Sequence, residues 1–169
     1  VFVLCSGSAV ALEQNENDYD ALVCAWYGGQ AGGTAVGDIV SGKVSPSGRL
    51  PITFYKSTAQ LPDFLDYSMK GRTYRYMTEE PLYPFGYGLS YADFSYGKAK
   101  LAVKEDGVTV SVKLKNKSKV DSDEIVQVYV KRLNDPDAPI KALKGFQRVS
   151  MKGGETKTVE IELPMSSFE

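Results

Sequence analysis

The spacing of hydrophobic residues changes twice along the chain and divides it into three stretches. In the first stretch, apolar runs at residues 1–5 and 21–27 each end at a glycine-containing turn. Short continuous apolar runs favour strands that are buried on both faces of a parallel sheet. Apolar residues then recur at helical spacing from residue 31 to residue 40, just before Gly42, which suits a helix C-terminus. Residues 1–42 are therefore predicted to form an α/β unit of parallel strands with a helix.

The second stretch, residues 43–92, has no long hydrophobic period because five prolines interrupt it. Twelve of the nineteen aromatic residues nevertheless lie between Phe54 and Tyr96. Disordered linkers are poor in aromatic residues. We therefore expect an ordered, extended, aromatic-rich connecting strap.

The third stretch, residues 93–169, has a hydrophobic period of two. Apolar and polar residues alternate at 108–115 and 158–163, and valines mark another such segment at 126–130. This period predicts half-buried antiparallel strands, and the turn sequences between them are spaced as in an immunoglobulin- or fibronectin-III-like β-sandwich. About five strands can be counted, whereas such sandwiches have about seven. We expect the sandwich to be truncated.

Composition and charge narrow the classes of partner. The net charge of −1, from 20 basic and 21 acidic residues, gives no field that would attract nucleic acid. No apolar run approaches the ~18 residues of a membrane span, so no membrane partner is expected. The chain begins directly on the apolar run at Val1, without a leader-like segment. We expect it to be a fragment of a longer protein.

The inventory of reactive side chains excludes several kinds of site. The sequence contains no histidine, which removes Ser-His-Asp and Cys-His catalysis and most metal sites. Cys5 and Cys24 each lie in an apolar run and are expected to be buried free thiols. The glycine-rich turn at 27–35 matches neither nucleotide-binding fingerprint. No metal and no cofactor are predicted.

The two strand-end turns are the best candidates for a ligand-facing surface. Adjacent parallel strands deliver their C-terminal turns to the same edge of a sheet, where α/β folds bind ligands. The side chains at these turns could hydrogen-bond and stack on a sugar without any charge. The alternative is that they pack a domain interface and never contact sugar. The candidate substrate-adjacent residues are Ser6, Ser8, Tyr27 and Gln30.

Three other clusters have simpler structural interpretations. The carboxylates Glu13, Glu16, Asp18 and Asp20 are expected in a solvated surface loop. Arginine and aromatic residues at 72–76 predict an extended segment with buried rings and guanidinium groups paired with carboxylates, although sugar stacking stays an alternative. The triplet 116–118 is an N-glycosylation sequon, a pattern that chance often produces.

Beyond periodicity, several sequence blocks follow one another in a fixed order, namely residues 1–9, 25–35, 48–55, 71–76 with 81–91, and 143–149. Together these blocks resemble the family 3 glycoside hydrolases. Residues 71–76 with 81–91 are similar to the junction that leads into that family's fibronectin-III-like domain, and residues 143–149 are similar to a strand within that domain. The junction is most like that of β-xylosidase-type members. The chain differs from the usual family pattern at Gly28, where proline is expected, and at Ala31, where glutamate is expected.

The resemblance implies a retaining β-glycosidase, either a β-xylosidase or a β-glucosidase, that acts on oligosaccharides and is secreted or periplasmic. In that family the Asp nucleophile lies on an N-terminal barrel and the Glu acid/base on an early loop of the second domain, both upstream of Val1. No catalytic residue is therefore assigned here. The partners implied are the N-terminal barrel, the rest of the second domain and the oligosaccharide substrate. Independently of the resemblance, truncated sheet edges are expected to promote self-association. The alternative is a non-catalytic carbohydrate-binding or adhesion module.

Overall fold

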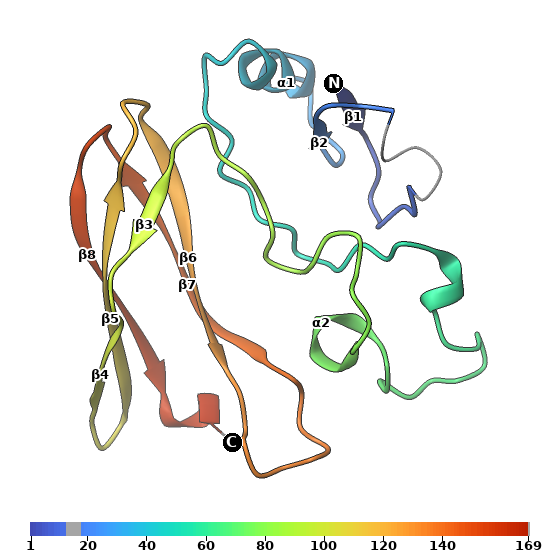
Figure 1. Ribbon diagram of the computed structural model, residues 1–169, viewed down its shortest axis with the longest axis vertical. Coiled ribbons are helices and arrows are strands. Elements are labelled where there is room, and N and C mark those ends of the chain that lie inside the picture. Colours follow the sequence, from blue (N-terminus) through green and yellow to red (C-terminus); the bar gives the residue numbers. More distant parts are fainter. Residues whose placement is uncertain (13–17, 169) are drawn as a thin grey trace. The chain divides into compact units, whose positions relative to one another are not determined.

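The computed structural model describes residues 1–12 and 18–168, and the chain divides into two compact units. The first unit contains residues 1–43 and 50–87, and the second contains residues 44–49 and 88–169. The segment 44–49 thus belongs with the second unit, although the residues on both sides of it belong to the first. Figure 1 traces this path by colour along the sequence.

The first unit opens with two parallel strands and a helix (Figure 1). Strand β1 (Phe2–Leu4) pairs with β2 (Leu22–Cys24), and helix α1 (Gly32–Val40) follows. The helix ends at the predicted place because Gly42 adopts a φ of 76° and donates its N–H to Ile39 O. Both strands are shorter than the apolar runs at residues 1–5 and 21–27.

The predicted burial of these strands is wrong for β1. Phe2 is 43% exposed and Val3 is 36% exposed, because β2 is the one pairing partner of β1 within the described residues. Cys5, the first residue beyond β1, is also exposed, while Cys24 is half-buried. Both cysteines are free, as expected, but the expected burial of both thiols is wrong for Cys5.

The remainder of the first unit has little regular structure and is held by aromatic packing. It contains a 3₁₀ helix η1 (Thr58–Gln60) and one short α-helix. Phe54 is 1% exposed and packs edge-on against the rings of Trp26 and Tyr83. Its backbone N–H also donates to Tyr83 O. The aromatic residues therefore order this segment, as their density predicts.

The segment predicted to be extended around residue 74 is instead helix α2 (Thr73–Tyr76). Side chains that lie far away in sequence fix its start. The Tyr55 hydroxyl accepts the Thr73 N–H, and Thr53 Oγ1 accepts the Tyr74 N–H. Among the described residues the Arg72 guanidinium donates to backbone carbonyls and not to the carboxylates that were expected. These tertiary hydrogen bonds override the local pattern, which could not reveal them.

The second unit is a β-sandwich of two sheets (Figure 1). In one sheet β5 pairs with β8 along one edge, and with β3 and then β4 along the other. In the other sheet β6 pairs with β7. Since β3 and β4 share one edge of β5, the six strands described in this unit fill five positions. The strands are β3 (Phe94–Tyr96), β4 (Lys100–Val103), β5 (Gly107–Asn116), β6 (Ser122–Val130), β7 (Ala142–Met151) and β8 (Thr156–Pro164), and a 3₁₀ helix η2 (Met165–Phe168) follows them.

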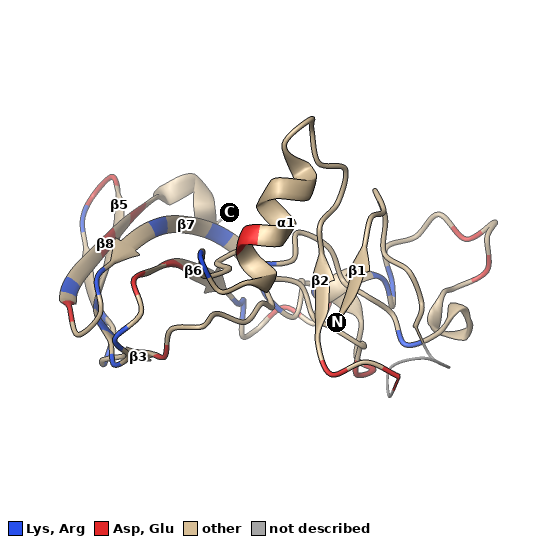
Figure 2. Cartoon of the chain, turned by 90° about the horizontal axis from the view of Figure 1, so that it is seen from above, with Lys and Arg blue, Asp and Glu red and all other residues tan. Residues whose placement is uncertain are grey.

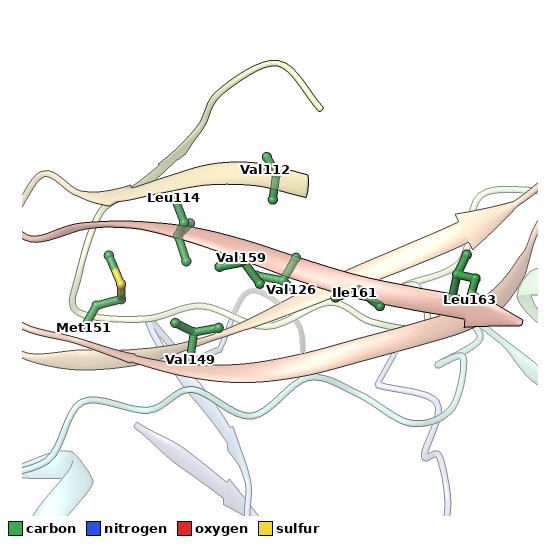
Figure 3. Packing of buried hydrophobic residues seen from close by; sticks show 8 residues of the cluster. All are labelled: Val112, Leu114, Val126, Val149, Met151, Val159, Ile161 and Leu163. Carbon is green, nitrogen blue, oxygen red and sulfur yellow. The ribbon is translucent and has the colours of Figure 1, made fainter. Parts of the chain in front are cut away.

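Alternate residues of these strands form the hydrophobic core. Figure 3 shows side chains from β5, β6, β7 and β8 meeting between the sheets. Leu114 is fully buried, so truncation to alanine would cost about 2–5 kcal/mol of stability. The period of two therefore correctly predicts which face of β5, β6 and β8 is buried. The cluster consists of Val112, Leu114, Val126, Val149, Met151, Val159, Ile161 and Leu163.

Candidate functional site

The structure brings the two predicted strand-end turns together. Leu4 at the end of β1 is in register with Cys24 at the end of β2, so the chain leaves both strands side by side. The Tyr27 ring covers Gly7, where an added Cβ would lie 2.6 Å from the ring. The turn at 6–8 and the turn at 27–30 thus form one rim, which we call the strand-end rim.

The polar groups of the rim differ in their local hydrogen bonding and in their exposure. The Ser6 hydroxyl donates to Ser8 O at 3.0 Å and accepts the Ser8 N–H, which closes a local turn. The Tyr27 side chain is 80% exposed, and Gln30 is exposed in the turn before α1. Tyr27 and Gln30 are therefore the rim side chains best placed to contact another molecule.

Backbone geometry fixes where Tyr27 points. Trp26 has a φ of 53°, a left-handed backbone conformation that residues other than glycine rarely adopt. Its ring packs edge-on against buried Phe54, and this contact holds the turn in place. A Cβ at Gly28 would lie 2.9 Å from Gly32 Cα. The turn therefore approaches α1 more closely than the proline of the family pattern would allow.

The rim is electrically neutral. Strands β1 and β2 carry no charged residue, as their uniform colour in Figure 2 shows. The one charged residue of α1, Asp38, forms an ion pair with Lys43 at 3.0 Å. Burial raises the pKa of the Cys24 thiol, which keeps it protonated. A neutral ligand such as a sugar suits these surroundings better than an ion does.

Other chemistry expected or excluded from the sequence can be placed as well. Asp18 and Asp20 are exposed, as predicted for a solvated loop, while Glu13 and Glu16 lie outside the described residues. Within residues 1–12 and 18–168, no group of three metal-ligating side chains gathers, and no helix is long and apolar enough to cross a membrane.

Sequence reasoning missed an ionic cluster in the second unit. Arg49 Nη2 lies 2.7 Å and 2.9 Å from the two carboxylate oxygens of Glu124, which also accepts the Tyr96 hydroxyl at 3.0 Å. Glu124 is 5% exposed. Because both of its oxygens accept hydrogen bonds from these donors, the Glu124 carboxylate holds the segment 44–49 on β6. No sequence signal links residues 75 positions apart.

Comparison with known proteins identifies the family. Residues 1–91 match the model of the glycosyl hydrolase family 3 C-terminal domain, and residues 124–169 match that of a fibronectin type III-like domain. The chain belongs to glycosyl hydrolase family 3. Its resemblance to this family is thereby confirmed, and the sandwich unit is the fibronectin type III-like domain.

Relatives with both predicted activities cover the chain. It is 48% identical over its whole length to a xylan 1,4-beta-xylosidase of Xylanibacter ruminicola and 36% identical to a periplasmic beta-glucosidase of Salmonella typhimurium. The crystal structure of a beta-glucosidase from Kluyveromyces marxianus in complex with glucose matches 99% of this chain with a TM-score of 0.88 and 36% identity. The chain spans 20% and 24% of the two sequence relatives and 22% of the solved chain.

Proposed function

We propose that this chain is the C-terminal part of a retaining β-glycosidase that removes terminal β-linked sugars from oligosaccharides. The observation that carries this proposal is the 48% identity, across the whole chain, to a protein named for β-xylosidase activity on xylan. That identity favours a β-xyloside over a β-glucoside as the preferred substrate. A relative named as periplasmic supports a secreted or periplasmic location for the parent protein.

The chain contributes architecture to that enzyme. Residues 1–42 form the last part of its second α/β domain, residues 43–92 form the connecting strap, and residues 93–169 form the fibronectin-III-like sandwich. The parallel pairing of β1 with β2 and the helix α1 support the first assignment. The catalytic nucleophile and the acid/base lie in the N-terminal barrel and the earlier part of the second domain, which are the partners of this chain.

The strand-end rim contributes contacts near the substrate. Its exposed ring and amide, Tyr27 and Gln30, lie on a neutral surface where a sugar can stack and hydrogen-bond. Ser6 and Ser8 shape the neighbouring turn. In the assembled enzyme this rim faces the aglycone side of the active site, so the rim sets substrate affinity and leaves the chemical step to the barrel carboxylates.

Kinetics of the full-length enzyme test both parts of the proposal. 4-Nitrophenyl β-xyloside is expected to be hydrolysed with a higher kcat/KM than the β-glucoside. Tyr27→Ala and Gln30→Ala are each expected to raise KM by a factor equivalent to about 1–2 kcal/mol, with kcat nearly unchanged. Phe146→Ala, at a 68% exposed ring on β7, is the matched control and should leave both constants unchanged. Unchanged kcat/KM with lowered thermal stability in the rim variants would assign the rim to a domain interface instead.

A further inference from the structure

An exposed apolar loop lies in the first unit, away from the strand-end rim in sequence. Between Pro62 and Gly71 the chain exposes 87% of Phe64, 77% of Leu65 and 87% of Tyr67. Large apolar side chains gathered on one exposed segment mark a binding surface more often than isolated ones do. We call residues 63–70 the aromatic loop.

Hydrogen bonds hold the backbone of the aromatic loop in one shape. The Arg72 guanidinium donates to the carbonyl oxygens of Asp63, Asp66 and Ser68. The Asp63 carboxylate accepts the Leu65 N–H, and the Asp66 carboxylate accepts the Ser68 N–H, each at 2.8 Å. These contacts lower the pKa of Asp66, mainly through its hydrogen bonds with Ser68. The rings are therefore presented from a preordered backbone, which reduces the entropy lost on binding.

A small cleft adjoins this loop. Pro62 and Gly71, the residues that flank the loop, both line a cleft of about 230 Å³. Its polar lining comes from Gln60, Thr78 and Glu79, and Gln60 Nε2 donates to Glu79 Oε2 at 3.1 Å. This volume is below the ~300 Å³ at which sites for drug-sized ligands begin, so the cleft suits a single small ring. Phe64 follows Pro62 by two residues, so its Cα lies within about 7.6 Å of the cleft wall.

We infer that the cleft and the aromatic loop form a carbohydrate-binding subsite that holds one unit of a neutral β-linked oligosaccharide. The Thr78 hydroxyl and the Glu79 carboxylate offer a donor and acceptors for sugar hydroxyls. The Gln60 amide is held in place, because its Nε2 donates to Glu79 and Glu80 and its Oε1 accepts the Lys56 N–H. The Phe64 and Tyr67 rings offer apolar faces for the C–H side of a pyranose. The subsite requires no rim residue and no hydrolysis, so binding at this subsite is tested independently of the proposed function.

Charge and composition favour a sugar over other occupants. The cleft lining includes one carboxylate and no Lys or Arg, which disfavours phosphates and other anions. The apolar side chains of the loop are interspersed with Asp63, Asp66 and Lys70. The cores of protein interfaces are depleted in such charges, so a protein partner fits this surface less well.

Binding measurements on the 169-residue chain test the inference directly. Xylohexaose is titrated into the chain and binding is followed by calorimetry and by the shifts of amide resonances. We expect saturable binding with a millimolar or lower Kd, resonance shifts at residues 60–79, and a Kd at least about fivefold higher for Phe64→Ala and Tyr67→Ala. Phe146→Ala on β7, an exposed ring outside the cleft, is expected to bind like the parent chain.

Three outcomes would overturn the inference. The first is no saturable binding at millimolar xylohexaose, and the second is binding that Phe64→Ala and Tyr67→Ala leave unchanged or that Phe146→Ala weakens equally. The third is a chain that self-associates through the loop, so that both loop variants turn an oligomer into a monomer by sedimentation. Because the loop side chains are exposed, both variants should fold, and circular dichroism checks this. Glu79→Gln, which keeps the shape of the cleft, supplies an independent variant that should also weaken binding.

Discussion

Arg49 and Glu124 form a nearly buried ion pair that joins the segment 44–49 to strand β6. Their side chains are 13% and 7% exposed, and one guanidinium nitrogen contacts both carboxylate oxygens. Around this pair, Ser45 and Ser122 hydrogen-bond at 2.9 Å, and Arg148 donates to Ser47 Oγ at 3.1 Å. The segment is thus part of the sandwich unit, although 38 residues of the first unit, 50–87, separate it from the rest of that unit in sequence.

Removing one partner of the pair should destabilise the chain strongly. Arg49→Met leaves a buried carboxylate without its counter-charge, which typically costs about 3–5 kcal/mol. Glu124→Gln should cost a similar amount, because it leaves the guanidinium unpaired. The free energy of unfolding in urea measures both losses.

A double variant and a surface pair provide the controls. Arg49→Met combined with Glu124→Leu should recover most of the loss, since an apolar pair of similar volume often replaces a buried ion pair without penalty. Lys43→Ala removes an exposed pair with Asp38 and should cost less than about 1 kcal/mol. Additive losses in the double variant would show that the two residues are not coupled.

Stability should fall at alkaline pH because of Tyr96. Burial of its hydroxyl, together with the adjacent Glu124 carboxylate, raises the pKa of Tyr96 above its ordinary value of 10.0. The unfolded tyrosine loses its proton first, so this contribution is complete below about pH 10 and is lost as the pH rises towards the folded pKa. Urea unfolding from about pH 8 to about pH 11 should show a steeper decline for the parent chain than for Tyr96→Phe. Parallel curves for the two proteins would contradict this.

The sequon at Asn116 should carry no glycan in the folded chain. Asn116 is fully buried, its Nδ2 donates to Val120 O at 2.8 Å, and its Oδ1 accepts from Ser118. Asn116→Ala should cost about 1–3 kcal/mol, because the Val120 carbonyl and the Ser118 N–H lose their partner. Secretion from a eukaryotic host followed by mass spectrometry tests the first statement, and a glycan on folded protein would refute it.

Self-association should involve the exposed strand β1. Phe2 and Val3 present an apolar edge, a surface that favours pairing between chains. Sedimentation at rising concentration should show association, and Val3→Lys should weaken it. Leu133→Lys, at an 83% exposed loop position, is the control that should have no effect. A monomer throughout the concentration range would count against an open edge.

The sequence predicts best where one local period decides the structure. Alternation at 108–115 places β5 and its buried face, and the glycine at position 42 marks the end of α1, because both depend on neighbouring residues alone. The contact between Gly7 and the Tyr27 ring follows from the parallel pairing that the apolar runs predict. The sequence therefore predicts where the strand-end rim lies but not what it does.

The remaining features depend on contacts between residues far apart in sequence. Helix α2 forms because Thr53 and Tyr55 accept its first N–H groups, which no local pattern encodes. The ion pair of Arg49 and Glu124 likewise joins residues whose local patterns are unremarkable. Long-range polar pairing of this kind is invisible to periodicity, which reports burial and not partners.

Hydrolysis by the 169-residue chain alone, compared with hydrolysis by the full-length enzyme, most directly tests whether the catalytic residues lie outside this chain. The nucleophile and the acid/base each contribute orders of magnitude to glycoside hydrolysis, and we place both outside this chain. The purified chain is therefore expected to release no 4-nitrophenol from aryl β-xylosides or β-glucosides, whereas the full-length enzyme turns over. Turnover by the chain alone that disappears when one of its own carboxylates is replaced by an amide would contradict the account.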